Sequence, residues 1–233
     1  MNTTISRNKS AFFRFLLEAQ ALQFGAFTLK SGRVSPYFFN AARFQTAGQL
    51  SRLGGFYAEI VAGAAPKTTV VAGPAYKGIP LCISTAIALS GLVGRDIGYL
   101  FNRKEAKTHG DEGLFVGRLP EAGDRLVLVD DVITDGETKR EVVALLRDAF
   151  SAPIDALVIA FDRMEQSDAG RNAVKDFQQA TGIPVHSIIT IADVQALLEQ
   201  EAAQAADAAT AGIPPALRDE IRAYRAEYGV QDA

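Results

Sequence analysis

Two adjacent carboxylates, Asp130 and Asp131, lie within the stretch VLVDDVITDGET, residues 127–138. The apolar residues before them are typical of a buried strand, and a polar loop with one glycine follows them. Carboxylates repel phosphate groups, but they accept hydrogen bonds from hydroxyls. We therefore expect Asp130 and Asp131 to bind a ligand through a diol, such as that of a ribose. The alternative is an acidic turn that only caps a helix.

The loop after the two acids has the features of a phosphate site. Gly136 can adopt positive φ, which lets neighbouring backbone N–H groups converge on an anion, and Thr134 and Thr138 add hydroxyl donors. A helix expected from Thr138 would add its own N–H groups and its dipole. Because the Gly-Lys-Ser/Thr of a Walker A loop is absent, we expect the loop to hold the 5′-phosphate of a ribose. The acids Asp135 and Glu137 would weaken phosphate binding unless both side chains point to solvent.

Two further glycine-containing segments carry cations. GPAYKGIP, residues 73–80, places Lys77 in a tight turn directly after an expected strand. Such a turn suits a pyrophosphate group, although an ordinary turn with a solvated lysine has the same composition. FNRKEAKTHGDEG, residues 101–113, shows no apolar periodicity, and we expect a mobile anion-binding lid there rather than a solvated charge run. Its cationic or protonatable residues are Arg103, Lys104, Lys107 and His109.

The segment FTLKSGRVSPYFFN, residues 27–40, combines Lys30 with the aromatic pair Phe38 and Phe39. Two short extended pieces around a Ser-Gly turn are expected here. Neighbouring aromatic residues usually lie in a core. Beside a lysine and a proline-containing turn they could also form the floor of a site for a planar base.

Short apolar runs alternate with longer helical patterns, which predicts an α/β fold with a mostly parallel central sheet flanked by helices. The expected strands are 69–72, 98–101, 126–129, 156–161 and 185–189, and the expected helices are 10–24, 48–62, 79–90, 138–148, 170–181, 193–206 and 215–228. Ligands of such sheets bind beyond the carboxyl ends of the strands. We expect a single domain over 1–233, with a small N-terminal hood of about 1–45 and a helical C-terminal tail of about 193–233.

The composition narrows the class of protein further. The chain has 233 residues, 48% of them hydrophobic, and a formal net charge of −3, which indicates neither a nucleic acid nor an anionic membrane as a partner. The longest apolar stretch, 79–93, is too short to span a bilayer. The single cysteine, Cys82, excludes an internal disulfide and suits a reducing compartment. We therefore expect a soluble cytoplasmic protein.

The sequence also resembles a known family. VLVDDVITDGET is similar to the signature of the type I phosphoribosyltransferases, which bind 5-phosphoribosyl 1-diphosphate (PRPP). Four motifs together resemble the orotate phosphoribosyltransferase branch in order and spacing: LKSGR.SPYFFN, GPAYKGIP, FNRKEAK.HG and LVDDVIT.G. FDR, residues 161–163, follows the fourth strand, where this branch has an arginine that meets the orotate carboxylate. The resemblance covers roughly residues 10 to 195.

This resemblance implies transfer of the phosphoribosyl group of PRPP to N1 of orotate, which yields orotidine 5′-monophosphate and pyrophosphate in pyrimidine biosynthesis. The residues implied for PRPP are Tyr76, Lys77, Arg103, Lys104, Lys107, His109, Asp130, Asp131, Val132, Ile133, Thr134, Asp135, Gly136, Glu137 and Thr138. Of these, Arg103, Lys104, Lys107, His109, Asp130 and Asp131 are implied for catalysis. The residues implied for orotate are Lys30, Phe38, Phe39, Thr134 and Arg163.

The resemblance further implies Mg²⁺, bound mainly through PRPP rather than by dedicated protein ligands, and a homodimer whose subunits share lid residues. Two other functions are weighed against this one. A purine or uracil phosphoribosyltransferase would keep the fold, but Phe38, Phe39 and Arg163 argue against it. A regulator that senses PRPP without catalysis should lack a complete lid or carry a basic DNA-binding module, and the sequence shows neither feature.

Overall fold

The computed structural model describes residues 7–29, 31–107, 113–134, 136–166, 170–203, 214 and 216–230, and for 106, 107 and 201–203 it describes the backbone alone. The chain divides into two compact units. The sheet unit comprises Gln45–Ala160 and Val174–Ile188. The terminal unit comprises Met1–Phe44, Phe161–Ala173 and Ile189–Ala233.

The sheet unit is built on a six-stranded sheet with the strand order β5-β4-β3-β6-β7-β8. The strands are β3 (Val70–Gly73), β4 (Gly98–Lys107), β5 (Gly113–Gly117), β6 (Leu126–Asp130), β7 (Ile154–Asp162) and β8 (Val185–Thr190). Strand β3 pairs in parallel with β4 and β6, β6 pairs in parallel with β7, and β5 runs antiparallel to β4 at the edge. The ends of β7 and β8 pass into the terminal unit.

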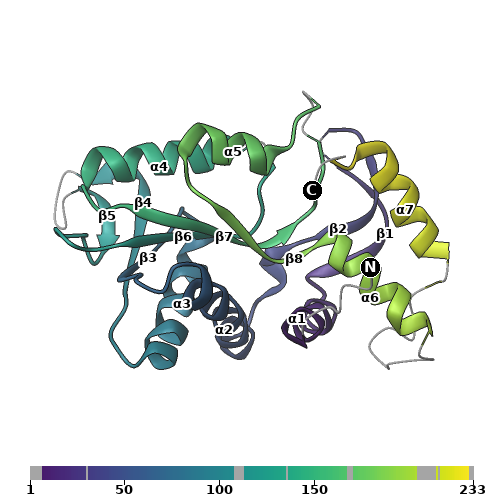
Figure 1. Ribbon diagram of the computed structural model, residues 1–233, viewed down its shortest axis with the longest axis horizontal. Coiled ribbons are helices and arrows are strands. Elements are labelled where there is room, and N and C mark those ends of the chain that lie inside the picture. The colour runs from purple at the N-terminus through teal and green to yellow at the C-terminus, as the bar shows by residue number, and fades with distance from the viewer. Residues whose placement is uncertain are drawn as a thin grey trace. The chain divides into compact units, whose positions relative to one another are not determined.

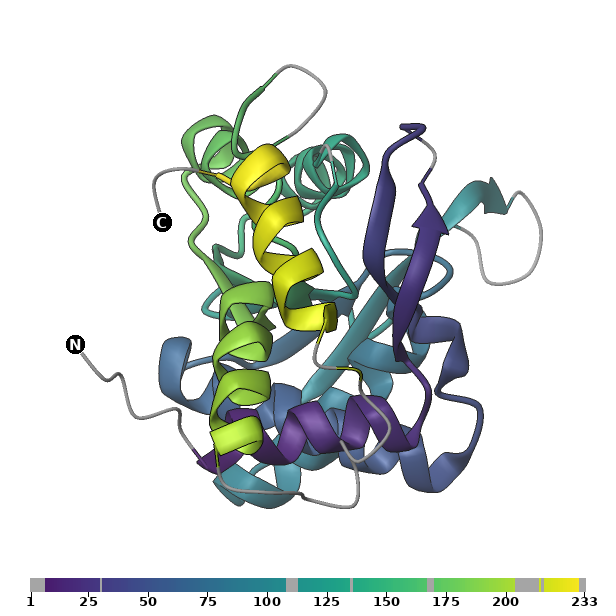
Figure 2. The same ribbon diagram turned by 90° about the vertical axis from the view of Figure 1, so that its right-hand side faces the viewer.

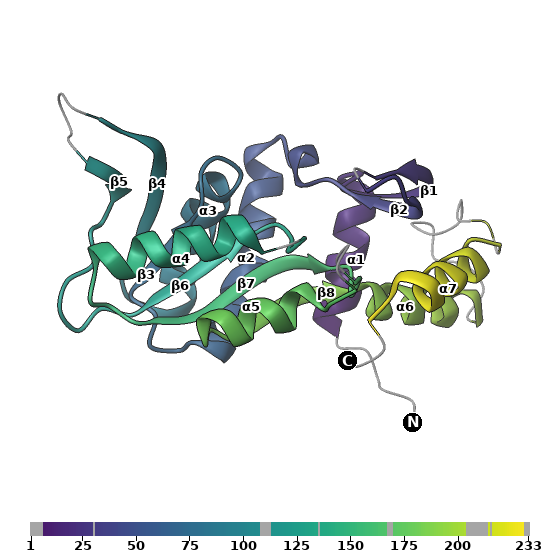
Figure 3. The same cartoon turned by 90° about the horizontal axis from the view of Figure 1, so that it is seen from above.

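Helices cover both faces of this sheet. Figure 1 shows α4 (Glu137–Ala149) and α5 (Ala173–Thr181) on one face, and α2 (Ala47–Ala64) and α3 (Gly78–Val93) on the other. The view in Figure 3 looks onto α4 and α5 from their side of the sheet. Strands β3 and β6 are buried along their whole length, as expected for central strands of a sheet covered on both faces.

The terminal unit combines a hairpin with three helices. Strands β1 (Leu22–Thr28) and β2 (Val34–Phe39) pair antiparallel, and a short 3₁₀ turn follows at Ala41–Arg43. The helices are α1 (Arg7–Glu18), α6 (Ile191–Ala203) and α7 (Ala216–Tyr228). Helix α6 contacts both α1 and α7, as Figure 2 shows with α6 in light green beside α7 in yellow. An ion pair between Lys9 and Asp193, 2.7 Å long, joins α1 to α6.

The predicted fold class is confirmed, whereas two of the expected elements end six residues away from their predicted ends. The helix expected over 10–24 ends at Glu18, because Gln20 has φ 53° and strand β1 begins at Leu22. The strand expected over 98–101 continues to Lys107 and pairs with β5, which the sequence reading missed. The segment expected to be a lid therefore starts and ends in an antiparallel ribbon.

The prediction of one domain with a hood and a tail stays a prediction. Among the described residues, none of the helices has the length and apolar character needed to cross a bilayer.

Candidate functional site

The two adjacent acids lie at the carboxyl end of β6 and are almost fully buried. Asp130 is 5% exposed and Asp131 is 6% exposed. Each carboxylate is held by the backbone that follows it. The Asp131 N–H donates to Asp130 Oδ1 over 2.8 Å, and the Val132 N–H donates to Asp131 Oδ1 over 2.8 Å. These bonds fix the orientation of both side chains before any ligand binds.

Each acid also has one lysine partner. Lys139 Nζ lies 2.7 Å from Asp130 Oδ2, and Lys77 Nζ lies 3.1 Å from Asp131 Oδ2. The two lysines differ in their access to solvent, since the side chain of Lys139 is 12% exposed and that of Lys77 is 62% exposed. The structure thus brings together two predicted PRPP residues, Lys77 and Asp131, and adds a lysine that the sequence reading missed.

Burial and charge affect the protonation of this cluster. Burial raises the pKa of Asp130, Lys139 acts to lower it, and the neighbouring Asp131 raises it further. The hydroxyl of Tyr57 donates to the Asp130 carbonyl oxygen over 2.7 Å. Burial and the two carboxylates raise the pKa of Tyr57 well above its ordinary value, so the hydroxyl stays a donor at neutral pH.

The turn after the acids leads into helix α4. Gly136 has φ 73° and precedes the first helical residue, Glu137. A Cβ at Gly136 would lie 3.1 Å from Arg140 Nη1, the end of a flexible side chain, so it is the positive φ that requires glycine here. The first N–H groups of a helix have no intrahelical acceptor, so they can donate to a bound anion. Binding of a phosphate at this turn stays a prediction.

The other loop residues differ in exposure. Thr134, Glu137 and Thr138 are exposed, Val132 is half-buried and Ile133 is buried. Glu137 would weaken phosphate binding unless its side chain points to solvent, and the structure shows this residue exposed. Asp135 lies outside the described residues.

The turn at Gly73–Gly78 is too tight for other residues at its two ends. A Cβ at Gly73 would lie 2.2 Å from the Gly78 carbonyl oxygen, and a Cβ at Gly78 would lie 2.6 Å from Pro74 Cδ. The peptide bond between Ala75 and Tyr76 is cis. This turn places Lys77 at the start of α3, directed to Asp131, and leaves Tyr76 66% exposed.

The ribbon β4–β5 positions the cations of the expected lid. Arg103 Nη1 donates to the Gly113 carbonyl oxygen over 2.9 Å, which ties β4 to β5. Lys104 Nζ lies 5.0 Å from the ring centroid of Tyr76, so two predicted PRPP residues are in contact through a cation–π interaction. Lys107 ends β4 and is described by its backbone alone, and His109 lies outside the described residues.

The residues predicted for orotate belong to the terminal unit, except Thr134. Arg163 follows β7 and is held by one oxygen of Glu165, Oε1, which accepts from Arg163 Nε (3.0 Å) and Nη2 (2.7 Å). The same oxygen accepts from the Tyr37 hydroxyl over 2.7 Å, and the guanidinium carbon of Arg163 lies 5.3 Å from the Tyr37 ring centroid. We call Tyr37, Arg163 and Glu165 the arginine network.

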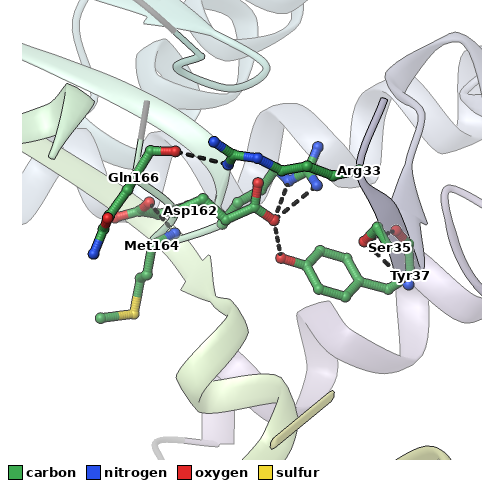
Figure 4. A network of polar contacts seen from close by, with 8 residues as sticks. Arg33, Ser35, Tyr37, Asp162, Met164 and Gln166 are labelled. Atoms are coloured by element: carbon green, nitrogen blue, oxygen red, sulfur yellow. Dashed lines mark hydrogen bonds and ion pairs between the residues drawn. The ribbon is translucent and has the colours of Figure 1, made fainter. Parts of the chain in front are cut away.

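Figure 4 shows the polar contacts that surround the arginine network. Arg33 Nη1 donates to the Gln166 carbonyl oxygen over 2.9 Å, and the Met164 N–H donates to Asp162 Oδ1 over 2.8 Å. The Ser35 hydroxyl donates to the Tyr37 carbonyl oxygen over 2.8 Å. The hairpin β1–β2 is thereby joined to the segment after β7.

The two aromatic residues predicted for orotate have different surroundings. Phe39 stacks on Phe161 with ring centroids 5.4 Å apart, whereas Phe38 stacks on Phe27 at 5.5 Å and is 37% exposed. Phe38 is therefore the one of the pair with a large accessible surface. Lys30 lies outside the described residues.

Sequence reasoning missed four residues of these sites: Tyr37, Tyr57, Lys139 and Glu165. A signal existed for Lys139, because a lysine in the first turn of a helix meets the positive end of the helix dipole and needs a compensating anion. Tyr37 and Glu165 gave no such signal, since they are 128 positions apart and meet only in the folded unit.

A model of the phosphoribosyl transferase domain matches residues 46–190, more than half of the chain. The fold and the acidic loop at the end of β6 thus define a protein of the phosphoribosyltransferase class.

Three relatives indicate which branch of the phosphoribosyltransferases this chain belongs to. An orotate phosphoribosyltransferase of Cellvibrio japonicus is 45% identical over 97% of this chain and 100% of its own length. The crystal structure of the Francisella tularensis orotate phosphoribosyltransferase shares 33% identity and a TM-score of 0.79, and covers 94% of this chain and 100% of that one. A Mycobacterium tuberculosis orotate phosphoribosyltransferase, solved in complex with PRPP, shares the fold with a TM-score of 0.59 at 21% identity, over 80% of this chain and 98% of that one. The chain belongs to the orotate phosphoribosyltransferase family.

Proposed function

We propose that this chain transfers the phosphoribosyl group of PRPP to N1 of orotate, with release of pyrophosphate. The observation that carries the proposal is the buried Asp130–Asp131 pair directly before the Gly136 turn and the start of α4. This arrangement offers acceptors for two ribose hydroxyls next to donors for a phosphate. A ribose 5-phosphate presents both kinds of group.

The chemistry of the transfer explains why acids stand on the ribose side. The bond between C1 and the pyrophosphate oxygen breaks, and its electron pair leaves with pyrophosphate while positive charge grows on the ribose ring. The electron pair of orotate N1 forms the new bond to C1, and the N1 proton is lost. Ionised Asp130 and Asp131, held by backbone N–H groups, would stabilise the positive charge through fixed electrostatics.

Cationic side chains would stabilise the negative charge that leaves with pyrophosphate. Lys77 and Tyr76 lie on one tight turn, and Lys104 lies over Tyr76, so these groups would meet the pyrophosphate of PRPP. Lys77 must exchange Asp131 for the ligand, and its 62% exposure permits that movement. Arg103, Lys107 and His109 would complete the lid and offset the charge of the leaving group.

Arg163 would bind the orotate carboxylate, because a guanidinium matches a carboxylate in two-pronged geometry. Glu165 and Tyr37 already fix the orientation of this guanidinium. Phe38 offers its exposed ring to the planar base. Lys30 and Thr134 are proposed for orotate on the resemblance alone.

Mg²⁺ would enter with PRPP, and when bound it would offset the charge of the diphosphate. Oxygen donors suit this ion, but the oxygens of Asp130 and Asp131 already accept from backbone N–H groups and lysines, which fits recognition of hydroxyls better than a dedicated ion site. The homodimer with shared lid residues, the cytoplasmic location and the role in pyrimidine biosynthesis remain parts of this proposal.

A parallel assay with orotate, uracil and hypoxanthine, each with PRPP and Mg²⁺, tests the proposal. We expect pyrophosphate release with orotate and little with the other two bases. Turnover of only uracil or hypoxanthine would assign a different base to the same fold. Binding of PRPP without release of pyrophosphate would instead favour a sensor that lacks catalysis.

A further inference from the structure

Every acceptor group of Asp130 has a partner within the sheet unit. The carboxylate oxygen Oδ1 accepts from the Asp131 N–H, Oδ2 accepts from Lys139 Nζ, and the carbonyl oxygen accepts from the Tyr57 hydroxyl. The distances are 2.8, 2.7 and 2.7 Å. Asp130 is therefore fixed from three places: the turn directly after β6, helix α4 and helix α2.

Lys139 occupies an unfavourable place for a cation. It is the third residue of α4, where the helix dipole presents positive charge, and its side chain is only 12% exposed. Burial also disfavours the charged form of a lysine. The pair with Asp130 offsets these costs, because each side chain gives the other a partner of opposite charge at 2.7 Å.

The contrast with Lys77 separates two roles. Lys77 pairs with Asp131 at 3.1 Å and is largely exposed, so it can leave its acid when a ligand arrives. Lys139 pairs with Asp130 at 2.7 Å and is nearly buried, so separation would leave two buried charges without partners. The Lys139–Asp130 pair therefore persists, whereas the Lys77–Asp131 pair can exchange.

The charge of this loop gives Lys139 a second reason to be present. The segment from Asp130 to Arg140, with both ends included, contains four acids and two bases. A phosphate cradle with that balance repels its ligand unless some of the acids are neutralised. Lys139 neutralises the acid that is most fixed and leaves its orientation unchanged.

We propose that Lys139 is a positioning residue of this enzyme, which keeps Asp130 ionised and oriented toward the ribose hydroxyls of PRPP. The inference rests on the proposed function, because it assigns to Asp130 a ribose ligand. Lys139 acts through Asp130 and needs no contact with the substrate. The charged and titratable groups around Asp130 in the described part of the sheet unit are Lys139, Asp131, Lys77 beyond it and Tyr57.

The test compares pH profiles of kcat/KM for PRPP, a quantity that reports ionisations of the free enzyme. In Lys139→Met, burial and Asp131 act on Asp130 without a compensating cation. The acidic limb should therefore move to higher pH, by about one to three units. Lys139→Arg keeps the positive charge, so its acidic limb should lie close to that of wild type. The matched control Lys67→Met, at an exposed lysine of the same unit, should leave the profile unchanged. An acidic limb in Lys139→Met that coincides with that of the control would overturn the proposal.

A double-mutant cycle shows whether Lys139 acts through Asp130. In an Asp130→Asn background, Lys139→Met should reduce kcat/KM less than about twofold further. Independent, multiplicative losses would mean that Lys139 contacts PRPP directly, which contradicts the positioning role. If Lys139→Met alone does not fold, the double variant decides, because removal of both charges should restore folding. Failure of the double variant to fold would also contradict the pairing argument.

The wild-type enzyme in the same assay separates the two proposals. If wild type releases no pyrophosphate with orotate, the proposed function fails. If wild type is active and the limb does not move in Lys139→Met, only the role of Lys139 fails.

Discussion

The acidic loop of the sheet unit and the arginine network of the terminal unit solve the same physical problem in different ways. Both keep carboxylates away from water, and both give each carboxylate a partner of opposite sign. In the loop, each carboxylate has one oxygen on a backbone N–H and the other on a lysine. In the arginine network, a single oxygen of Glu165 accepts from Arg163 twice and from Tyr37 once.

The two regions differ in how readily a partner can leave. Arg163 and Glu165 are 17% and 15% exposed, and the Tyr37 hydroxyl that completes the network belongs to a buried residue. In the loop, by contrast, Lys77 is mostly exposed. Exposed ion pairs contribute little to stability, and buried ones are costly to break. The comparison indicates that the loop can exchange a protein partner for a ligand, whereas the network is arranged in advance and keeps its partners.

Arg163→Ala should produce the largest effect on the network side. Loss of a charged partner of the orotate carboxylate should raise the KM for orotate about a hundredfold or more, with a much smaller change in the KM for PRPP. Steady-state kinetics with each substrate varied in turn measure both values. The matched control is Arg43→Ala, at an exposed arginine of the same unit.

Arg163→Ala also leaves Glu165 without its cation, so a second variant guards against loss of folding. Arg163→Lys keeps a positive charge beside Glu165 but loses the planar fork. It should still raise the KM for orotate while the protein remains folded. An unchanged KM for orotate in both variants would remove Arg163 from the site.

Lys77→Ala tests whether the Lys77–Asp131 pair of the acidic loop can exchange for a ligand. The KM for PRPP should rise about ten- to a hundredfold, because the variant lacks a cation for pyrophosphate. The free energy of unfolding should change by less than about 1 kcal/mol, since the Lys77–Asp131 pair is largely exposed on the lysine side. Urea unfolding beside Lys67→Ala measures the second quantity. A large loss of stability would show that this pair is structural and cannot exchange.

Tyr37→Phe removes one hydrogen bond of the arginine network and keeps the ring under Arg163. We expect the free energy of unfolding to fall by about 1 kcal/mol, with a moderate increase of the KM for orotate as Glu165 becomes less fixed. Tyr99→Phe, at a tyrosine that is 40% exposed, serves as the control. Equal stability of Tyr37→Phe and wild type would mean that the hydroxyl adds nothing to the network.

The smallest predicted effect is the contribution of Asp130 to the pH dependence of the unfolding free energy. Because burial raises the pKa of Asp130, the folded protein takes up this proton more readily than the unfolded chain. The contribution of Asp130 to stability is therefore present below the ordinary pKa of 3.8 and is lost as pH rises through the raised value. Relative to Asp130→Asn, wild type should lose unfolding free energy as pH rises over that window. A difference that grows in the opposite direction with pH would contradict the assigned shift.

The acidic loop could be predicted from sequence because its determinants are local. A buried strand, two acids, a glycine and a helix start follow one another within 127–138. Lys77 was placed near it only through the rule that ligands bind beyond the carboxyl ends of parallel strands. Arg163 was predicted, but its partners in the arginine network, Tyr37 and Glu165, were not, because they come from distant parts of the chain and neither carries a local signature.

Two errors in the fold have similar causes. Apolar residues continue with helical spacing beyond Glu18, so the end of α1 is decided by the pairing of Leu22 with Phe39 in the hairpin rather than by local sequence. The edge strand β5 is five residues long, lies in a segment rich in glycine and charge, and forms through its pairing with β4. In both places long-range pairing overrides the local pattern.

A crystal structure with PRPP, Mg²⁺ and a non-reactive orotate analogue tests the central claim most directly. We expect the ribose hydroxyls on the carboxylates of Asp130 and Asp131, the 5′-phosphate within the turn at Gly136, and Lys139 still paired with Asp130. A ribose bound elsewhere, with both carboxylates unchanged and no phosphate at Gly136, would contradict the account.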